Sequence, residues 1–281
     1  MEKIVLFYKF VPIGDTETVR FWQRALCEKL GLKGRVLISP HGINATLGGG
    51  LQALKFYTRE MKAHSLFGDI TWKWSEGSAS DFPKLSVRVR DEIVAFGVAD
   101  ELKIDDGGVV DGGQRLTPDE LHQLIAERGH EVVFYDGRNP FEAEIGRFDN
   151  AIIPKVEHSR DFVADIENGE ISQHKKRPVV TYCTGGIRCE VLTSLMRSRG
   201  YEEVYQLEGG IVKYGERFGD AGLWKGKLYV FDDRMQVAFS GDSDDIGRCC
   251  SCGATSSRQV NSTGVRRKLQ VCCETCPVPI D

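Results

Sequence analysis

The chain has 281 residues, of which 41% are hydrophobic and 28% charged, a composition typical of a folded globular protein and not of a disordered or fibrous one. No stretch approaches the ~20 consecutive apolar residues of a membrane helix, and residues 1–10 lack the pattern of a secretion signal. We therefore expect a cytoplasmic protein with more than one domain and no association with a membrane.

Charge is unevenly distributed along the chain. Residues 1–90 carry 14 Lys and Arg against 8 Asp and Glu, residues 91–245 carry 18 against 31, and residues 246–281 carry 5 against 2. The two ends are therefore basic and the middle is acidic. A basic end is compatible with an anionic partner such as RNA, although an excess of this size is also common on surfaces that bind nothing.

The N-terminal residues predict a small unit of strands and helices. Hydrophobic periodicity indicates helices over 16–30 and 51–61 and strands over 4–10, 35–38, 43–47, 70–74 and 85–94. Their order along the chain is that of a split βαβ unit. Gly31 is placed to end the first helix. We assign residues 1–96 to a ferredoxin-like (acylphosphatase-like) α+β sandwich.

A glycine-rich and acidic stretch at 97–114 is expected to be a linker. Thr117, Pro118 and Glu120 then form the start pattern of a helix that reaches about Arg128.

Beyond this helix, strands alternate with helices, which indicates a doubly wound parallel sheet. The strands are expected at 132–136, 151–153, 179–182 and 204–207, with helices near 161–168 and after Cys183. The predicted fold class is therefore α/β, with this sheet over 115–225 and a small cysteine-rich segment over 226–281.

The segment 182–190, with the sequence YCTGGIRCE, is the most informative in the chain. Cys183 ends a predicted buried strand, a glycine pair permits a tight loop, and a helix begins directly afterwards. This arrangement aims backbone N–H groups at the sulfur and, together with Arg188, favours a thiolate or a bound anion. A lone free cysteine is more often a buried small hydrophobe, but the glycines and the arginine favour a nucleophile.

Cys189, in the first turn of that helix, is either a resolving thiol or a packing residue. The candidate catalytic residues are therefore Cys183, Arg188 and Cys189.

At these residues the chain resembles a rhodanese domain. The loop Cys-x4-Arg is that of the sulfurtransferase type and is one residue shorter than the Cys-x5-Arg loop of related phosphatases. A turn at 136–138 and the segment 146–154 stand at the family's usual earlier positions. The resemblance implies a substrate site formed by Thr184, Gly185, Gly186, Ile187, Asp136 and Arg138.

Four motifs narrow the resemblance to the rhodanese-containing tRNA uridine-34 hydroxylases. They are GINAT at 42–46, CTGGIRCE at 183–190, EGGI at 208–211 and VFDDRM at 230–235. The resemblance implies an oxidoreductase that forms 5-hydroxyuridine at the wobble position of tRNA. Molecular oxygen would be its co-substrate and the anticodon stem-loop its partner, a function that the sulfurtransferase-like fold alone would not indicate.

The sequence contains no flavin or nicotinamide signature and no two-His-one-carboxylate spacing, so how oxygen is activated does not follow from it.

The C-terminal cysteines have the spacing of a metal site. Cys249-x2-Cys252 and Cys273-x2-Cys276 stand twenty residues apart, which fits a four-thiolate zinc ribbon. Cys250 and Cys272 are additional thiols beside these pairs, which leaves the ligand set open. The alternative is a group of reduced cysteines without metal.

Several side chains are candidates for contact with RNA. Phosphate could be bound by Arg20, Arg24, Lys33, Arg35 and the run Arg266, Arg267, Lys268. Trp72 and Trp74 alternate on one predicted strand, a pattern that belongs more often to a core than to a platform for stacked bases.

Two other functions stay open at this point. One is a sulfurtransferase that carries sulfane sulfur on a Cys183 persulfide. The other is a non-catalytic RNA-binding or redox-sensing protein. Nucleoside analysis of tRNA from cells that lack the protein distinguishes the three functions. A hydroxylase predicts loss of 5-hydroxyuridine-derived nucleosides, a sulfurtransferase predicts loss of thiolated nucleosides, and a non-catalytic protein predicts no change.

Overall fold

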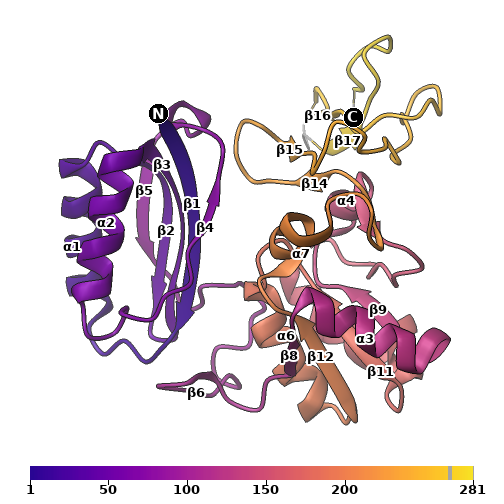
Figure 1. Ribbon diagram of the computed structural model, residues 1–281, viewed down its shortest axis with the longest axis horizontal. Coiled ribbons are helices and arrows are strands. Elements are labelled where there is room, and N and C mark those ends of the chain that lie inside the picture. The colour runs from indigo at the N-terminus through magenta and orange to yellow at the C-terminus, as the bar shows by residue number, and fades with distance from the viewer. Residues whose placement is uncertain (265–267, 281) are drawn as a thin grey trace. The chain divides into compact units, whose positions relative to one another are not determined.

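The computed structural model describes residues 1–264 and 268–280, and it divides the chain into two units, Met1–Asp111 and Gly112–Asp281 (Figure 1). Each unit encloses a hydrophobic core of its own. Within the described ranges, no helix combines the length and hydropathy that a bilayer crossing requires.

The first unit contains a five-stranded sheet. Its strands are β1 (Glu2–Phe10), β2 (Lys33–Ser39), β3 (Gly42–Gly50), β4 (Lys73–Ser75) and β5 (Leu85–Val89). They lie in the order β4-β1-β3-β2-β5. Strand β3 lies between β1 and β2 and is antiparallel to both, whereas β5 pairs in parallel with β2. The ferredoxin-like prediction is confirmed, with β5 as an additional edge strand.

Helices α1 (Thr16–Lys29) and α2 (Leu51–Ala63) cover one face of this sheet (Figure 1). Asp15 caps α1 by accepting a hydrogen bond from the Thr18 N–H at 2.9 Å, and Gly31, with φ of 64°, ends it as predicted. The buried faces of both helices pack on Val36 and Val87 of the sheet.

Two predicted strands of this unit are longer than the observed ones. Residues 70–72 precede β4 and residues 90–94 follow β5. Ile70 and Trp72 pack into the core without joining the ladder, since β4 pairs with only three residues of β1. Hydrophobic spacing at 70–72 thus reflects packing in the core and not strand pairing, which begins at Lys73.

The segment predicted as a linker also contains structure. Strands β6 (Ile104–Asp105) and β7 (Gly108–Val109) form a short hairpin, and the segment's last residue begins β8 (Gln114–Leu116).

The second unit contains the predicted parallel sheet, in the order β8-β12-β11-β9. Its other strands are β9 (Val133–Asp136), β11 (Pro178–Tyr182) and β12 (Glu203–Leu207). All five residues of the central strand β11 are buried. The expected strand at 151–153 is reduced to one bridge, between Tyr135 and Ile152, because Pro154 has no N–H with which to extend the ladder.

Five α-helices accompany this sheet: α3 (Pro118–Arg128), α4 (Pro140–Ala143), α5 (Phe162–Asn168), α6 (Ile187–Ser198) and α7 (Gly210–Phe218). The predicted start of α3 is confirmed, because Thr117 and Glu120 form a reciprocal capping box.

Short elements complete both units. Three antiparallel pairs join β10 (Gly146–Phe148) to β13 (Trp224–Gly226), β14 (Leu228–Tyr229) to β15 (Gln236–Val237), and β16 (Gln259–Asn261) to β17 (Leu269–Val271). The 3-10 turns are η1 (Ala79–Asp81), η2 (Gly129–Glu131), η3 (Ser159–Asp161) and η4 (Glu170–His174).

Candidate active site and metal centre

Cys183 is the first residue after β11, and its side chain is fully buried. Gly186, with φ of 97°, occupies the left-handed region at the start of α6, which a residue with a side chain rarely adopts. The resulting turn directs the Gly186 N–H at the sulfur, with an N···Sγ distance of 3.2 Å. The glycine pair therefore shapes the loop around the thiol, as predicted.

Helix α7 supports the same loop from the other side. The Ile211 N–H donates to the Cys183 carbonyl at 2.9 Å, and the Val212 N–H donates to the Thr184 carbonyl at 3.1 Å. A Cβ on Gly210 would lie 2.4 Å from the Cys183 carbonyl oxygen, so only glycine permits this approach. The EGGI motif thus matches a packing requirement of the cysteine loop.

The loop favours a thiolate at Cys183. Burial raises the pKa of this thiol, but three influences outweigh burial: a hydrogen bond from the Cys189 thiol, the charge of Arg188, and the N–H groups of both residues. The pKa of Cys183 therefore lies below that of an ordinary thiol. Burial and the adjacent sulfur raise the pKa of Cys189, which stays protonated as the donor of the pair.

Arg188 is held by a buried acid that sequence analysis did not identify. Its guanidinium donates to both carboxylate oxygens of Glu142, at 2.6 and 2.9 Å, and to the Thr184 hydroxyl at 3.2 Å. The Arg188 side chain is 11% exposed and that of Glu142 is fully buried. Asn139 and Pro140 signal the helix start that positions Glu142 at its third residue, but nothing local indicates that this carboxylate reaches Arg188.

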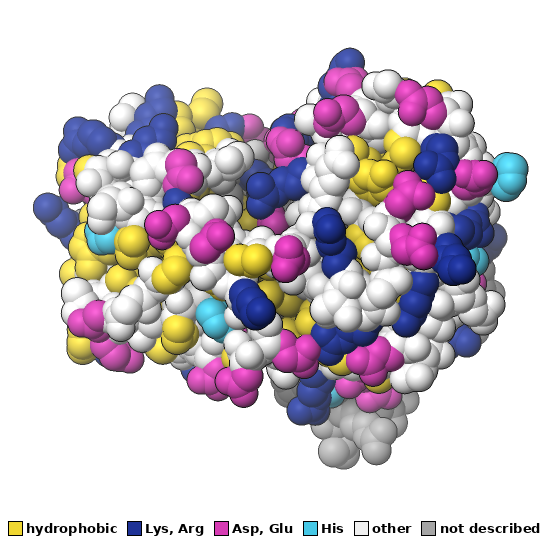
Figure 2. Space-filling model, turned by 90° about the horizontal axis from the view of Figure 1, so that it is seen from below, with side chains coloured by type: hydrophobic (Ala, Val, Ile, Leu, Met, Phe, Trp, Pro, Cys, Tyr) yellow, Lys and Arg dark blue, Asp and Glu magenta, His cyan; other side chains and the backbone are white. Residues whose placement is uncertain are grey.

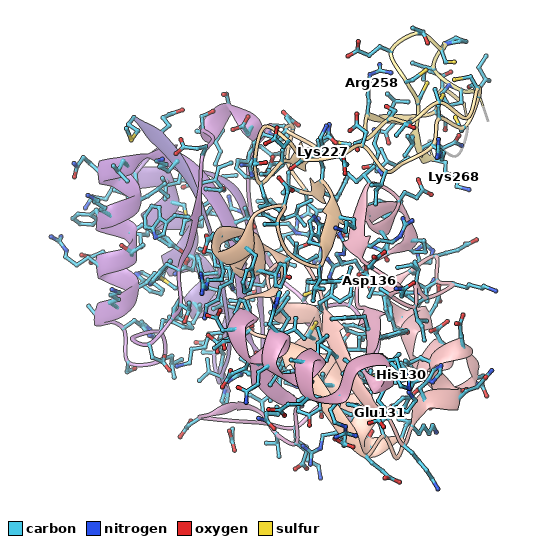
Figure 3. All side chains as sticks on the ribbon, turned by 45° about the vertical axis from the view of Figure 1, so that its right-hand side comes forward. His130, Glu131, Asp136, Lys227, Arg258 and Lys268 are labelled. Carbon is cyan, nitrogen blue, oxygen red and sulfur yellow. The ribbon has the colours of Figure 1, made fainter. Side chains whose placement is uncertain are left out.

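Asp136 and Arg138 pair with each other beneath the surface. Arg138 donates to the two Asp136 oxygens at 2.9 and 2.6 Å and to the Gly146 carbonyl at 2.7 Å, and both side chains are fully buried. Figure 3 shows Asp136 within the second unit, away from the C-terminal segment that carries Arg258 and Lys268. These contacts fix the turn that follows β9.

The structure gathers the predicted loop residues 183–189 around one sulfur. Within this loop Thr184, Ile187 and Arg188 are partly exposed, whereas Gly185 and Gly186 are buried with Cys183 and Cys189. The side chains of this loop that solvent reaches are therefore those of Thr184, Ile187 and Arg188.

The C-terminal cysteines converge as their spacing predicts. The sulfur atoms of Cys249, Cys252, Cys273 and Cys276 all lie within 4.8 Å of one another. The Cys252 and Cys273 sulfurs are 3.7 Å apart, and a tetrahedral zinc site with Zn–S distances of about 2.3 Å separates its sulfurs by about 3.8 Å. The donor set and its dimensions fit zinc.

The two additional thiols lie outside this cluster. Cys250 is exposed, and the Cys272 sulfur lies against the carbonyl oxygens of Cys273, Cys276 and Pro277. Neither thiol belongs to the four sulfurs that converge, and the Cys272 thiol also forms a hydrogen bond with that of Cys249.

The first unit carries a group of arginines on the sheet face opposite its helices. Arg35 on β2 pairs in register with Ser86, and Leu37 pairs with Arg88, so both arginines project from the face opposite Val36 and Val87. Arg90 follows two residues after Arg88, on the same side. We call Arg35, Arg88 and Arg90 the arginine cluster.

No acid of the described residues pairs with the arginine cluster. Burial, followed by the charges of Arg90 and Arg88, lowers the pKa of Arg35, as expected for neighbouring cations that no carboxylate neutralises. By contrast, Arg20 and Arg24 on α1 pair with Glu17 and Glu28.

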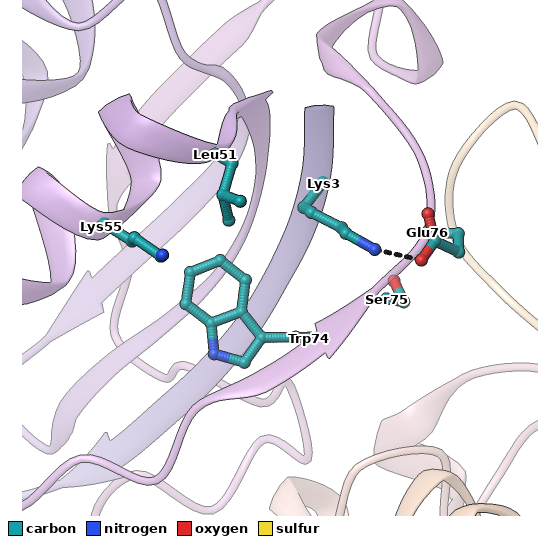
Figure 4. A pocket seen from close by; sticks show the side chains of 6 residues that line it. All are labelled: Lys3, Leu51, Lys55, Trp74, Ser75 and Glu76. Carbon is teal, nitrogen blue, oxygen red and sulfur yellow. Dashed lines mark hydrogen bonds and ion pairs between the residues drawn. The ribbon is translucent and has the colours of Figure 1, made fainter. Parts of the chain in front are cut away.

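Trp72 and Trp74, which were predicted to lie on one strand, differ in their surroundings. The Trp72 ring packs 4.6 Å from that of Phe7 in the core, whereas Trp74 is 36% exposed on the edge strand β4. In Figure 4 the Trp74 ring lies in a surface hollow between Lys55 and Lys3, and Lys3 forms an ion pair with Glu76.

Of the basic run at 266–268, which was expected to contact phosphate, Arg266 and Arg267 lie outside the described residues.

Three families match consecutive parts of the chain. They are the UPF0176 acylphosphatase-like domain over residues 2–93, the rhodanese-like domain over 117–217, and the rhodanase C-terminal family over 225–279.

Curated relatives match over nearly the full length. The chain is 56% identical to the tRNA uridine(34) hydroxylase of Corynebacterium jeikeium (strain K411), over 98% of this chain and 89% of that protein. It is 54% identical to the tRNA uridine(34) hydroxylase of Rhodococcus erythropolis (strain PR4 / NBRC 100887), over 98% of this chain and 96% of that protein.

Proposed function

Because the chain belongs to the tRNA uridine(34) hydroxylase family, we propose that it hydroxylates uridine 34 of tRNA to 5-hydroxyuridine, with molecular oxygen as co-substrate. The observation that carries this proposal is the Cys183 loop, which directs the Gly186 N–H at the sulfur and favours its thiolate form at the carboxyl end of a central parallel strand. A cytoplasmic location is part of the proposal, because tRNA is the substrate.

In this proposal Cys183 supplies the reactive sulfur. The Gly186 N–H and Arg188 stabilise its negative charge, and the Cys189 thiol donates a hydrogen bond to it. Thr184 and Ile187 contact the substrate from the partly exposed part of the loop.

Asp136 and Arg138 contribute to the same site through its framework. Their full burial and mutual hydrogen bonds support a role in holding the turn after β9 in place, rather than direct contact with the base. Gly137, between them, donates its N–H to the Tyr182 carbonyl at 2.8 Å, which ties this turn to the end of β11.

The arginine cluster supports binding of the anticodon stem-loop. Cations without carboxylate partners are free to bind phosphate, and such contacts position RNA without reading its sequence. Figure 2 shows acidic and basic side chains interspersed over the face that it presents, so attraction for a polyanion depends on local groups of this kind.

We also propose that Cys249, Cys252, Cys273 and Cys276 hold one structural zinc ion. The ion would tie the Cys249 loop to the segment after β17 and stabilise the fold of the C-terminal segment, with no part in the reaction.

The test is nucleoside analysis of tRNA from cells that lack the gene and are complemented with the wild-type or the Cys183→Ser chain under labelled oxygen gas. Restoration of 5-hydroxyuridine carrying the label by the wild type alone supports the proposal. Restoration by Cys183→Ser would refute a reactive thiol. Changes confined to thiolated nucleosides would indicate sulfur transfer instead, and no change in any nucleoside would indicate a non-catalytic role.

A further inference from the structure

Phe231 exposes a large apolar surface in the second unit. The residue is 63% exposed, although single exposed hydrophobic residues are common and need no explanation of their own. Phe231 belongs to the VFDDRM motif at 230–235, to which the chemistry proposed for the Cys183 thiolate assigns no role. Its exposure is informative for this reason.

The segment that carries Phe231 is held in a defined conformation. It connects β14 to β15, and the Val230 N–H closes the turn by donating to the Met235 carbonyl at 3.1 Å. Within the turn Arg234 donates to both oxygens of the nearly buried Asp232 carboxylate, at 2.7 and 2.6 Å. Met235 adopts a left-handed φ of 61°, a conformation that such fixed surroundings maintain.

This turn places the Phe231 ring beside the cysteine loop. The Arg188 guanidinium carbon lies 5.9 Å from the centre of the Phe231 ring, while the same guanidinium contacts Thr184 within the loop. The ring also rests edge-on against Tyr229, with centroids 5.0 Å apart, and Tyr229 rests in the same way against Phe141. An aromatic surface thus remains open to solvent beside Arg188, the arginine of the cysteine loop.

We infer that Phe231 is the platform on which the target uracil stacks when it enters the site, an inference that rests on the proposed hydroxylase function. Proteins that act on single bases take the base out of its stack and bind it between aromatic or apolar side chains. The fully buried Cys183 requires such an unstacked base, and Phe231 is the exposed aromatic residue that contacts the loop arginine.

The first test measures how fast 5-hydroxyuridine appears in tRNA after each variant is induced in cells lacking the gene. Phe231→Ala and Phe231→Leu should slow the reaction by roughly 5- to 150-fold, the range found when one stacked base loses its aromatic partner. Phe231→Tyr and Phe231→Trp should retain most of the rate. Leucine keeps the apolar surface without the ring, so a normal rate in Phe231→Leu would overturn the inference.

Phe21 provides the matched control. It is 61% exposed in α1 and lies 4.2 Å from the Arg20 guanidinium carbon, so it shares the exposure and the arginine contact of Phe231 without the cysteine loop. Phe21→Leu should keep the wild-type rate. Alkylation of Cys183 by iodoacetamide should be equal in wild type and Phe231→Leu, and a parallel loss of alkylation would show that Phe231 acts only by packing.

A second test does not depend on hydroxylation. An anticodon stem-loop RNA with 5-iodouridine at position 34 should crosslink on irradiation to the peptide that contains Phe231, and Phe231→Leu should abolish this crosslink. A crosslink confined to other peptides would overturn the inference. A wild-type chain that crosslinks at Phe231 but restores no 5-hydroxyuridine would refute the proposed function and leave the stacking site supported.

Discussion

Cys183 and Cys189 have the same side chain, but their surroundings shift the pKa values of the two thiols in opposite directions. Cys183 receives hydrogen bonds and faces Arg188, whereas Cys189 donates to its neighbour and keeps its proton. A single thiolate is thereby assigned to the residue at the strand end. The charge of Arg188 is itself balanced by Glu142, so the backbone N–H groups and the Cys189 thiol carry much of the stabilisation.

This arrangement predicts how the reactivity of Cys183 depends on pH. Because its pKa is lowered, Cys183 should remain a thiolate at pH values where an ordinary thiol is protonated, and reactivity should fall only as pH drops through the lowered value. Cys189→Ala removes one donor and should move the midpoint to higher pH. Mass spectrometry of the iodoacetamide-alkylated Cys183 peptide across pH measures both midpoints, and identical midpoints would contradict the assigned role of Cys189.

At the scale of elements, local sequence signals predicted most helices and strands but not the contacts between distant ones. The capping box of α3 and the cap at Gly31 depend on neighbouring residues, which is why both are confirmed. The Glu142 to Arg188 pair joins residues 46 positions apart, so no local pattern reveals it. The loop residues were recognisable because strand, glycines, cysteine and arginine are contiguous.

The buried Asp136 to Arg138 pair predicts a large effect on stability. Arg138→Met would leave the Asp136 carboxylate buried without its partner and should lower the free energy of unfolding by about 3–5 kcal/mol. Arg128→Met, which breaks an exposed pair with Glu131, is the control and should cost much less. Urea denaturation followed by circular dichroism measures both. Equal losses in the two variants would contradict a structural role for the buried pair.

The C-terminal cluster predicts about one zinc ion per chain when the protein is purified under reducing conditions. Cys252→Ser removes one of the four converging sulfurs and should abolish stoichiometric zinc, whereas Cys250→Ser, at an exposed thiol outside the cluster, should retain it. Elemental analysis of the wild type and the two variants is the measurement. A wild-type chain that is folded and free of metal would show that the cluster does not require zinc.

For the whole molecule, the charge distribution indicates that one part of the chain attracts the RNA and another part carries the cysteine loop. Residues 91–245 contain the cysteine loop and carry a large excess of acids, which repel a polyanion, whereas the first ninety residues carry the arginine cluster. We therefore expect attraction to tRNA and the reaction at the thiol to depend on different parts of the chain. Productive binding should then require both parts, because phosphate contacts alone do not select a base.

Salt dependence of RNA binding tests this separation. Replacing Arg35, Arg88 and Arg90 by Gln should make the slope of log K against log salt less negative by about 2–3 units, at roughly 0.7–0.9 for each phosphate that is no longer neutralised. Replacing Arg128, Arg199 and Arg217 by Gln removes the same charge from arginines that already pair with acids, and should change the slope little. Fluorescence anisotropy with an anticodon stem-loop measures both. Equal changes would show that only net charge matters.

The two hydrogen bonds from α7 to the cysteine loop have a consequence for how the site opens. Cys183 is fully buried, so any reagent that reaches it must await a local displacement of the loop, and this displacement separates the Ile211 and Val212 amides from the Cys183 and Thr184 carbonyls. Hydrogen–deuterium exchange at these two amides should therefore occur at a rate that matches the opening measured by alkylation of Cys183. The exchange rates of these two amides in α7 would then report how often Cys183 becomes accessible to reagents.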